Sequence, residues 1–172
     1  MRNEWCWSDL HIDHEHALTG RGWFPTLKEY QDDVASKWDH FVKPEDTIHL
    51  VGDIALYWEG LNWIKARPGY KILYEGNHDA ERENSHRDLI GVYDDVRGFW
   101  KHRKGIYIGH APIHPCELRG RRMIHGHTHN KIIQDQRYIN VCIDVLRDGP
   151  VNMKDIISGA YRSYREPTVV RG

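Results

Sequence analysis

The stretch Gly76-Asn77-His78-Asp79 follows the apolar run Lys71-Ile72-Leu73-Tyr74. A short run with β-branched and aromatic residues that stops at a glycine predicts a buried strand that leads into a tight loop. The loop then carries an amide, an imidazole and a carboxylate in succession, and burying such groups without partners costs several kcal/mol. Because a polar turn would look the same over four residues, the interpretation depends on whether other parts of the chain repeat the pattern.

Four other apolar runs end in side chains of the same kinds. These endings carry Asp9 and His11, Asp53, His110, and His127 with His129. Counting the ending with Asn77, four of the five include a glycine, which lets the backbone turn sharply or approach closely. Since ligands collect where the strands of layered sheets end, we expect the five loops to meet at one rim.

Strands and helices are expected to alternate between these endings. The predicted strands cover residues 4–8, 47–51, 70–74, 93–100, 105–108, 123–124 and 138–145. The clearest predicted helix covers residues 26–42, because Thr26 and Glu29 form a capping box and apolar residues recur at steps of three and four. Further helical segments are expected at 55–66, near 80–88 and around 153–157. We find no internal repeat or linker, so a single domain over residues 1–172 is predicted.

Composition narrows the class of protein. A net charge of -1 argues against a general affinity for nucleic acid carried by bulk charge. The three cysteines are far apart and form no CxxC pair, which favours a reduced, cytoplasmic setting over a disulfide framework. Neither a signal peptide nor an apolar run long enough to span a membrane is evident, so a cytoplasmic protein is expected.

Histidine is the residue type in excess, with 13 in the chain. Asp9 and His11 are two apart, so on an extended segment both side chains point to one side, as a divalent ion requires. The seven candidate ligands in the five loops are more than one ion needs and about right for two ions that share a carboxylate. Oxygen and imidazole ligands without thiolate favour Mn²⁺, Fe or Zn²⁺. Four histidines without ligand-like neighbours are expected to have no role; they are His40, His49, His86 and His102.

Taken in order, the motifs Asp-x-His, Gly-Asp, Gly-Asn-His-Asp, Gly-His and Gly-His-x-His resemble those of the calcineurin-like metallophosphoesterase superfamily. The resemblance spans roughly residues 8–130 and is nearest to the small single-domain phosphoesterases of bacteria and phages. Residues 141–151 also resemble the tail of those proteins. It implies an α+β fold: a four-layer α/β/β/α sandwich in which helices flank two packed, mixed β-sheets.

The resemblance also implies roles for individual residues. The first ion would be held by Asp9, His11 and His129, Asp53 would bridge, and Asn77, His110 and His127 would complete the second. His78 matches the family's general acid, which also binds the phosphoryl oxygen together with Asn77, and Asp79 would orient or tune it. His14 matches a histidine that lines the phosphate site in smaller members. The implied cofactors are two divalent ions, Mn²⁺ first, with Fe, Zn²⁺ and Ni²⁺ as alternatives.

The implied reaction is hydrolysis of a phosphate ester by in-line attack of a metal-bridging hydroxide. The chain is short for a large cap domain, and an open cleft would admit a diester, so we favour a phosphodiesterase acting on nucleotide-like substrates or nucleic-acid ends. A phosphomonoesterase acting on proteins or nucleotides is the alternative. Neither a membrane nor an obligate protein partner is expected, and the cell would be a bacterium or a phage-infected host.

Two rival classes deserve comparison. The run Asp9-x-His11-x-Asp13-His14 looks like the metallo-β-lactamase-fold motif with its first histidine replaced, but that class leaves Gly76–Asp79 unexplained. A non-enzymatic binding scaffold would be expected to have lost ligand positions, and none is missing here. The basic residues near 97–104 and 119–122 could steer a phosphate ester or an oligonucleotide end, although solvated surface is the favoured interpretation. Asp13, Glu15, His16 and His125 are expected to lie around the site or face solvent.

Overall fold

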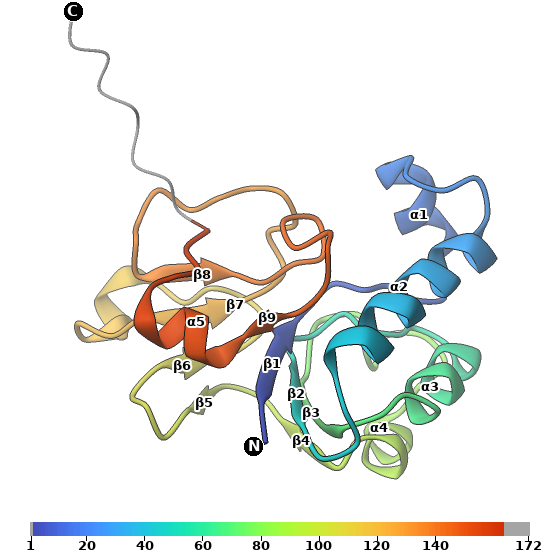
Figure 1. The fold of residues 1–172 in the computed structure, drawn as a ribbon, viewed down its shortest axis with the longest axis horizontal. Coiled ribbons are helices and arrows are strands. Elements are labelled where there is room, and N and C mark those ends of the chain that lie inside the picture. Colours follow the sequence, from blue (N-terminus) through green and yellow to red (C-terminus); the bar gives the residue numbers. More distant parts are fainter. Residues whose placement is uncertain (1, 164–172) are drawn as a thin grey trace, which may run out of the picture.

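Two β-sheets packed against each other form the centre of the protein (Figure 1). The computed structural model describes residues 2–163, which adopt an α+β fold with two mixed sheets. The fold class expected from the sequence is therefore confirmed at this level.

The first sheet has the strand order β4-β3-β2-β1-β9. Its strands are β1 (Glu4–Trp7), β2 (Thr47–Leu50), β3 (Tyr70–Tyr74), β4 (Asp95–Arg97) and β9 (Val151–Asn152). The first four run parallel, whereas β9 pairs with β1 in the antiparallel sense. Parallel neighbours need crossover connections, and here each crossover contains a helix. All four carboxyl ends therefore lie at one edge.

The second sheet has the order β5-β6-β7-β8. Its strands are β5 (Trp100–Lys101), β6 (Tyr107–Ile108), β7 (Met123–His125) and β8 (Tyr138–Asn140). β6, β7 and β8 are parallel and β5 is antiparallel to β6. A single bridge between Ser8 and Cys142 links the two sheets just beyond β1 and β8. The bridge brings the loops after both sheets together.

The helices follow the crossovers and the chain end. They are α1 (Glu15–Arg21), α2 (Leu27–Phe41), α3 (Trp58–Lys65), α4 (His86–Val92), the 3-10 helix η1 (Pro115–Leu118) and α5 (Met153–Ser158). In Figure 1 the first four lie on the side of the five-stranded sheet that faces away from the second sheet. Within residues 2–163, none of the helices combines the length and apolar character needed to span a bilayer.

Alternation along the strands divides the core into layers. Successive side chains of a strand point to opposite faces, so Trp7 packs under the helices while Cys6 packs between the sheets. The helix-facing core includes Tyr30, Val34 and Trp38 of α2. Beyond the second sheet, a smaller cluster is closed by η1 and by loops.

Several element boundaries differ from the sequence prediction for identifiable reasons. The predicted strand 93–100 is broken at Gly98 into β4 and β5, which belong to different sheets. Helix α3 begins only at Trp58, because the Asp13 carboxylate accepts the backbone N–H groups of Leu56 and Tyr57 at 2.8 and 2.7 Å. The helix expected near 80–88 is shifted to α4, and α1, η1 and β9 were not predicted.

Candidate metal centre

Loops from both sheets converge on one group of polar side chains. In the first sheet, the loop after β1 carries Asp9 and His11, the loop after β2 carries Asp53, and the loop after β3 carries Asn77. In the second sheet, the loop after β6 carries His110, and the loop after β7 carries His127 and His129. All seven predicted ligands are therefore contributed by strand ends. They form two neighbouring groups of three, with Asn77 beside the second.

The first group consists of Asp9, His11 and His129, each of which offers one ligand atom within 4.8 Å of the others. His129 Nε2 lies 3.8 Å from Asp9 Oδ1, and the imidazole rings of His11 and His129 are stacked with centroids 5.5 Å apart. Asp9 and His11 are buried, and His129 is half-exposed. A carboxylate and two imidazoles at these separations suit a divalent ion with an open coordination position.

The second group consists of Asp53, His110 and His127, again within 4.8 Å. His110 Nε2 lies 3.2 Å from Asp53 Oδ2 and 3.2 Å from Asn77 Oδ1. His127 Nδ1 lies 3.0 Å from the same Asn77 oxygen. The amide oxygen of Asn77 is therefore well placed as a fourth ligand of this group.

Asp53 lies between the two groups. Its Oδ2 atom is 3.2 Å from His110 Nε2 and 3.9 Å from His11 Nε2, so one carboxylate reaches both. Burial alone would raise the pKa of Asp53, but the hydrogen bond and charge of His110 outweigh it and lower that pKa. A carboxylate held ionised between two ligand groups has the position expected of a bridge.

Backbone strain is concentrated at the candidate ligands. Five of the six non-glycine residues with positive φ in the described chain are ligands: Asp9 (56°), His11 (46°), Asp53 (55°), His127 (66°) and His129 (50°). Such left-handed conformations are uncommon outside glycine and persist where the surrounding structure enforces them. The surrounding structure therefore holds the backbone in unfavourable conformations that orient these side chains toward one another.

The surroundings of three histidines, His11, His110 and His129, fit a metal site in their hydrogen bonding. Neither ring nitrogen of buried His11 has a hydrogen-bond partner within residues 2–163, and burial lowers the pKa of His11 to about 3. Its ring is thus neutral with an available lone pair. In two other candidate ligands one ring nitrogen has a partner outside the group: His110 Nδ1 donates to Val51 O at 2.9 Å, and His129 Nδ1 lies 3.1 Å from Asp144 Oδ2. Such outer partners orient metal-binding histidines.

Asp9 has its own supporting contacts. Its carboxylate accepts hydrogen bonds from Ser8 Oγ at 2.6 Å, from Cys142 Sγ at 3.0 Å and from the backbone N–H of His127 at 3.0 Å. Burial nevertheless raises the pKa of Asp9. A cation beside this carboxylate would offset the unfavourable burial of its charge.

Two glycines allow the loops to approach each other this closely. A Cβ atom on Gly76 would lie 2.3 Å from Asp53 Oδ1, and one on Gly126 would lie 2.4 Å from Asp9 Oδ2. Real Cβ atoms do not come so near to another heavy atom. The glycines of the Gly-Asn-His-Asp and Gly-His-x-His stretches are therefore required by contact with the ligand carboxylates.

His78 and His14 lie beside the first group without belonging to it. The ring centroids of His11 and His78 are 5.7 Å apart, and those of His14 and His78 are 6.4 Å apart. His78 Nδ1 is hydrogen-bonded to the Glu81 carboxylate. The His78 side chain is partly exposed, so its ring is accessible to a ligand. The structure therefore brings both predicted substrate-binding histidines to the rim of the centre.

Asp79 joins two loops of the centre through backbone hydrogen bonds. Its buried carboxylate accepts the backbone N–H groups of Asp53, Ile54 and Gly76 at 2.9, 2.8 and 2.8 Å. Burial raises the pKa of Asp79 to about 6. Glu81 contacts the His78 ring, whereas Asp79 holds the loop of Asp53 against its own, and the role of Asp79 in orienting or tuning His78 stays a prediction.

Sequence reasoning missed the residues that support the ligands. Asp144, Glu81, Ser8 and Cys142 contact ligand or neighbouring side chains, yet only their position in the fold shows it. Asp144 also pairs with Arg21, whose Nη2 lies 2.9 Å from Asp144 Oδ2. The spacing Asn140-x-x-x-Asp144 gives no signal that would single this carboxylate out.

Two cavities flank the centre. One, of about 610 Å³, is bordered by Asn77, His110 and His127 and has Phe99 in its wall. The other, of about 420 Å³, is bordered by His129 and Asp144 together with Arg147. A ligand could therefore extend from the centre in either direction.

Comparison with known proteins identifies relatives that match most of the chain. No protein-family model matches the sequence. The Gene 66 protein of Mycobacterium phage L5 is 31% identical over an alignment of 182 residues that covers 84% of this chain and 87% of the phage protein. The Gene 66 protein of Mycobacterium phage D29 is 29% identical, covering 86% and 91%.

One solved structure shares the fold. The crystal structure of AQ665, a protein of unknown function from Aquifex aeolicus, superposes with a TM-score of 0.73 at 23% identity. The match covers 92% of this chain and 99% of AQ665. At that identity the likeness concerns the fold alone. From its identity and coverage with the L5 protein, the chain belongs to the family of the mycobacteriophage Gene 66 proteins.

Proposed function

We propose that the protein is a dinuclear metal-dependent phosphoesterase of the calcineurin-like kind. The observation that carries the proposal is the pair of three-ligand groups that meet at Asp53, one with His11 and the other with His110. A single ion would need only one of these groups. The two-sheet architecture is compatible with a four-layer metallophosphoesterase sandwich whose outermost layer is reduced to η1 and loops.

The metals in this proposal are two divalent ions, with Mn²⁺ first and Fe, Zn²⁺ or Ni²⁺ as alternatives. When bound, such ions neutralise phosphoryl charge and activate water for attack on phosphorus. Asp9, His11 and His129 would hold the first, and His110, His127 and Asn77 the second, with Asp53 shared.

His78 supplies the acid in this proposal. Its Nε2 edge lies on the side of the ring away from Nδ1, which is bonded to Glu81. From there it can bind a phosphoryl oxygen and pass a proton to the leaving oxygen, while Glu81 fixes the ring orientation. His14, with its ring near both His11 and His78, would add a further contact to the phosphate.

The substrate is proposed to be a phosphodiester of the nucleotide type, including nucleic-acid ends. The cavities on both sides of the centre leave room for a group on each side of the phosphorus, as a diester has. The phage relatives support a role in the cytoplasm of a bacterial host. A phosphomonoesterase is the second candidate, because the same ligand set serves both reactions.

The test compares turnover of bis-p-nitrophenyl phosphate and p-nitrophenyl phosphate by protein stripped of metal and refilled with Mn²⁺. We expect two ions per chain and faster cleavage of the diester. The matched control is Asp53→Asn, which keeps the size of the side chain and should lose turnover. Faster monoester cleavage would make the protein a phosphatase, and two bound ions without turnover of either ester would favour a metal-binding scaffold.

A further inference from the structure

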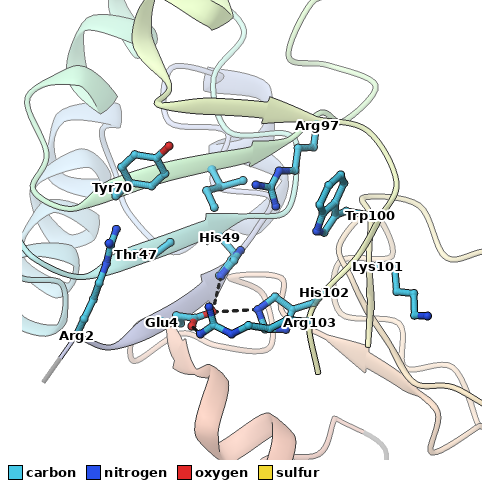
Figure 2. A pocket seen from close by; sticks show the side chains of 11 residues that line it. Arg2, Glu4, Thr47, His49, Tyr70, Arg97, Trp100, Lys101, His102 and Arg103 are labelled. Carbon is cyan, nitrogen blue, oxygen red and sulfur yellow. Dashed lines mark hydrogen bonds and ion pairs between the residues drawn. The ribbon is translucent and has the colours of Figure 1, made fainter. Parts of the chain in front are cut away.

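A further cavity, distinct from the two beside the metal centre, opens at the opposite end of the first sheet. Its volume is about 760 Å³, in the range of small-ligand sites, and its lining includes Glu4, Thr47 and Tyr70 at the starts of β1, β2 and β3. The candidate metal centre instead follows the ends of these strands. Figure 2 shows Arg2 and Tyr70 on one side of the cavity, with Arg97 and Trp100 on the other.

The lining is strongly cationic. Four positively charged side chains, Arg2, Arg97, Lys101 and Arg103, stand against one carboxylate, that of Glu4. Arg97 is engaged by Asp95 and Arg103 by Glu4. Arg2 and Lys101 form no ion pair with a carboxylate in the described part of the chain. The cavity therefore has positive charge that no protein group neutralises, which favours an anionic ligand.

The Glu4 carboxylate is already saturated by donors. Glu4 Oε2 lies 3.2 Å from His49 Nε2 and 3.1 Å from His102 Nε2, and Arg103 contacts the other oxygen. Burial would raise the pKa of Glu4, but the hydrogen bonds from His49 and His102, with Arg103 adding its charge, lower that pKa to about 2. These histidines were expected to have no role, and both are buried.

Glu4, His49 and His102 have the spacing of a metal site, but their hydrogen bonds favour a different role. His102 Nδ1 accepts the backbone N–H of Lys104 at 3.4 Å, which leaves the ring proton on Nε2, directed at Glu4. An Nε2–H group cannot ligate a cation, and the arginine on Glu4 would repel one. With the ionised Glu4 paired to Arg103, the three residues instead form a hydrogen-bonded floor under the cationic walls.

Two half-exposed aromatic rings complete the cavity. Tyr70 is 41% exposed and Trp100 is 45% exposed. Each has a guanidinium over its ring: Arg2 lies 5.5 Å from the Tyr70 centroid and Arg97 lies 4.3 Å from that of Trp100. Proteins that bind single-stranded nucleic acid combine cationic grooves with aromatic rings on which bases stack.

We propose that this cavity binds a nucleotide unit, either free or as part of a single-stranded nucleic acid. The base would lie against Tyr70 or Trp100, and its phosphate would pair with Arg2. The inference stands on this cavity alone and does not depend on the proposed phosphoesterase activity.

The test measures binding of adenosine 5′-monophosphate and of a short fluorescent oligothymidylate to metal-stripped protein in the presence of EDTA. The test variants are Arg2→Glu and Trp100→Ala. Their controls are Arg87→Glu and Trp58→Ala, which change exposed residues of the same types on α4 and α3. Each test variant should weaken binding by about tenfold, and added salt should weaken it further.

The probes and variants separate the outcomes. Binding of the monophosphate would support a free nucleotide as ligand, and binding of the oligonucleotide alone would support nucleic acid. Equal affinity of the test and control variants would overturn the proposal. So would nucleotide binding that is lost in Asp53→Asn and retained in Arg2→Glu, because the ligand would then lie at the metal centre. In a separate titration without EDTA, a Zn²⁺ ion that binds the Asp53→Asn protein and is lost on adding His49→Ala would overturn it too, because the cavity would then hold a metal.

Discussion

At the scale of single residues, the proposed role of His78 as general acid depends on its lying near the candidate ligands without being one of them. Its backbone N–H donates to Asp53 at 2.9 Å, so the main chain fixes the position of the imidazole independently of any ion. Replacing His78 with Ala should leave both metals bound and lower kcat for esters with poor leaving groups by about 10²–10⁴. Esters of p-nitrophenol, whose leaving group needs little protonation, should be affected much less. Metal content and kcat on both ester classes check this.

Glu81 provides the comparison for His78. Since Glu81 is bonded to His78 Nδ1 and is not within the ligand groups, Glu81→Gln should lower kcat less than His78→Ala and should also keep both ions. Loss of an ion from His78→Ala would show that His78 is a ligand, and the assignment as acid would then be wrong.

A second residue-scale prediction concerns Glu4. Because its folded-state pKa, about 2, lies below the ordinary value of 4.5, its ionised form stabilises the fold. That contribution is complete above pH 4.5 and disappears as the pH falls toward 2. The free energy of unfolding of Glu4→Gln should therefore be lower than that of the native protein at neutral pH, and the two should converge in acid. Urea unfolding across this range measures the difference, and a difference independent of pH would contradict the assignment.

At the scale of elements, the loops after the strands depend on glycines for contact with the ligand carboxylates. A Cβ on Gly126 would also lie 2.8 Å from the backbone oxygen of Val51, which cannot move aside as a side chain can. We expect Gly126→Ala to lose the first ion and nearly all turnover while the sheets remain folded. Gly91→Ala in α4, where a Cβ meets nothing within 4 Å, is the matched control and should keep both ions. Equal metal content in the two variants would refute this role of Gly126.

The sequence predicted the fold best where polar candidate ligands directly follow the end of an apolar strand. β3 was predicted residue for residue, and the polar residues that follow it lie at the expected strand end. Supporting contacts were not predictable, because they join residues far apart in the chain. Glu4 contacts His49 and His102, which are 45 and 98 residues away in the chain, and no local sequence pattern predicts such contacts. The break between β4 and β5 was missed because periodicity carries no information on which sheet a strand joins.

At the scale of the whole molecule, the candidate centre joins the two sheets. Each three-residue group takes ligands from both: Asp9 and Asp53 follow strands of the first sheet, and His129, His110 and His127 follow strands of the second. Apart from the apolar layer between the sheets, this edge is joined by the bridge of Ser8 and Cys142, by backbone hydrogen bonds and by side-chain contacts such as those of Asp9 with Cys142 and of His110 with Val51. Ions bound at the centre should therefore stabilise the packing of one sheet on the other.

The size of that stabilisation follows from mass action. With one site filled at 100 times its Kd, the free energy of unfolding should rise by about 2.7 kcal/mol, which for a domain of this length raises Tm by roughly 5–10 °C. Calorimetry of stripped protein with and without Mn²⁺ measures the shift. In Asp53→Asn, where the shared carboxylate is replaced by a neutral amide, the shift should largely vanish because both groups lose a ligand or a neighbour. The same shift in Asp53→Asn and in the native protein would mean that the ions bind elsewhere, and His49→Ala would then show whether the Glu4 cluster holds them.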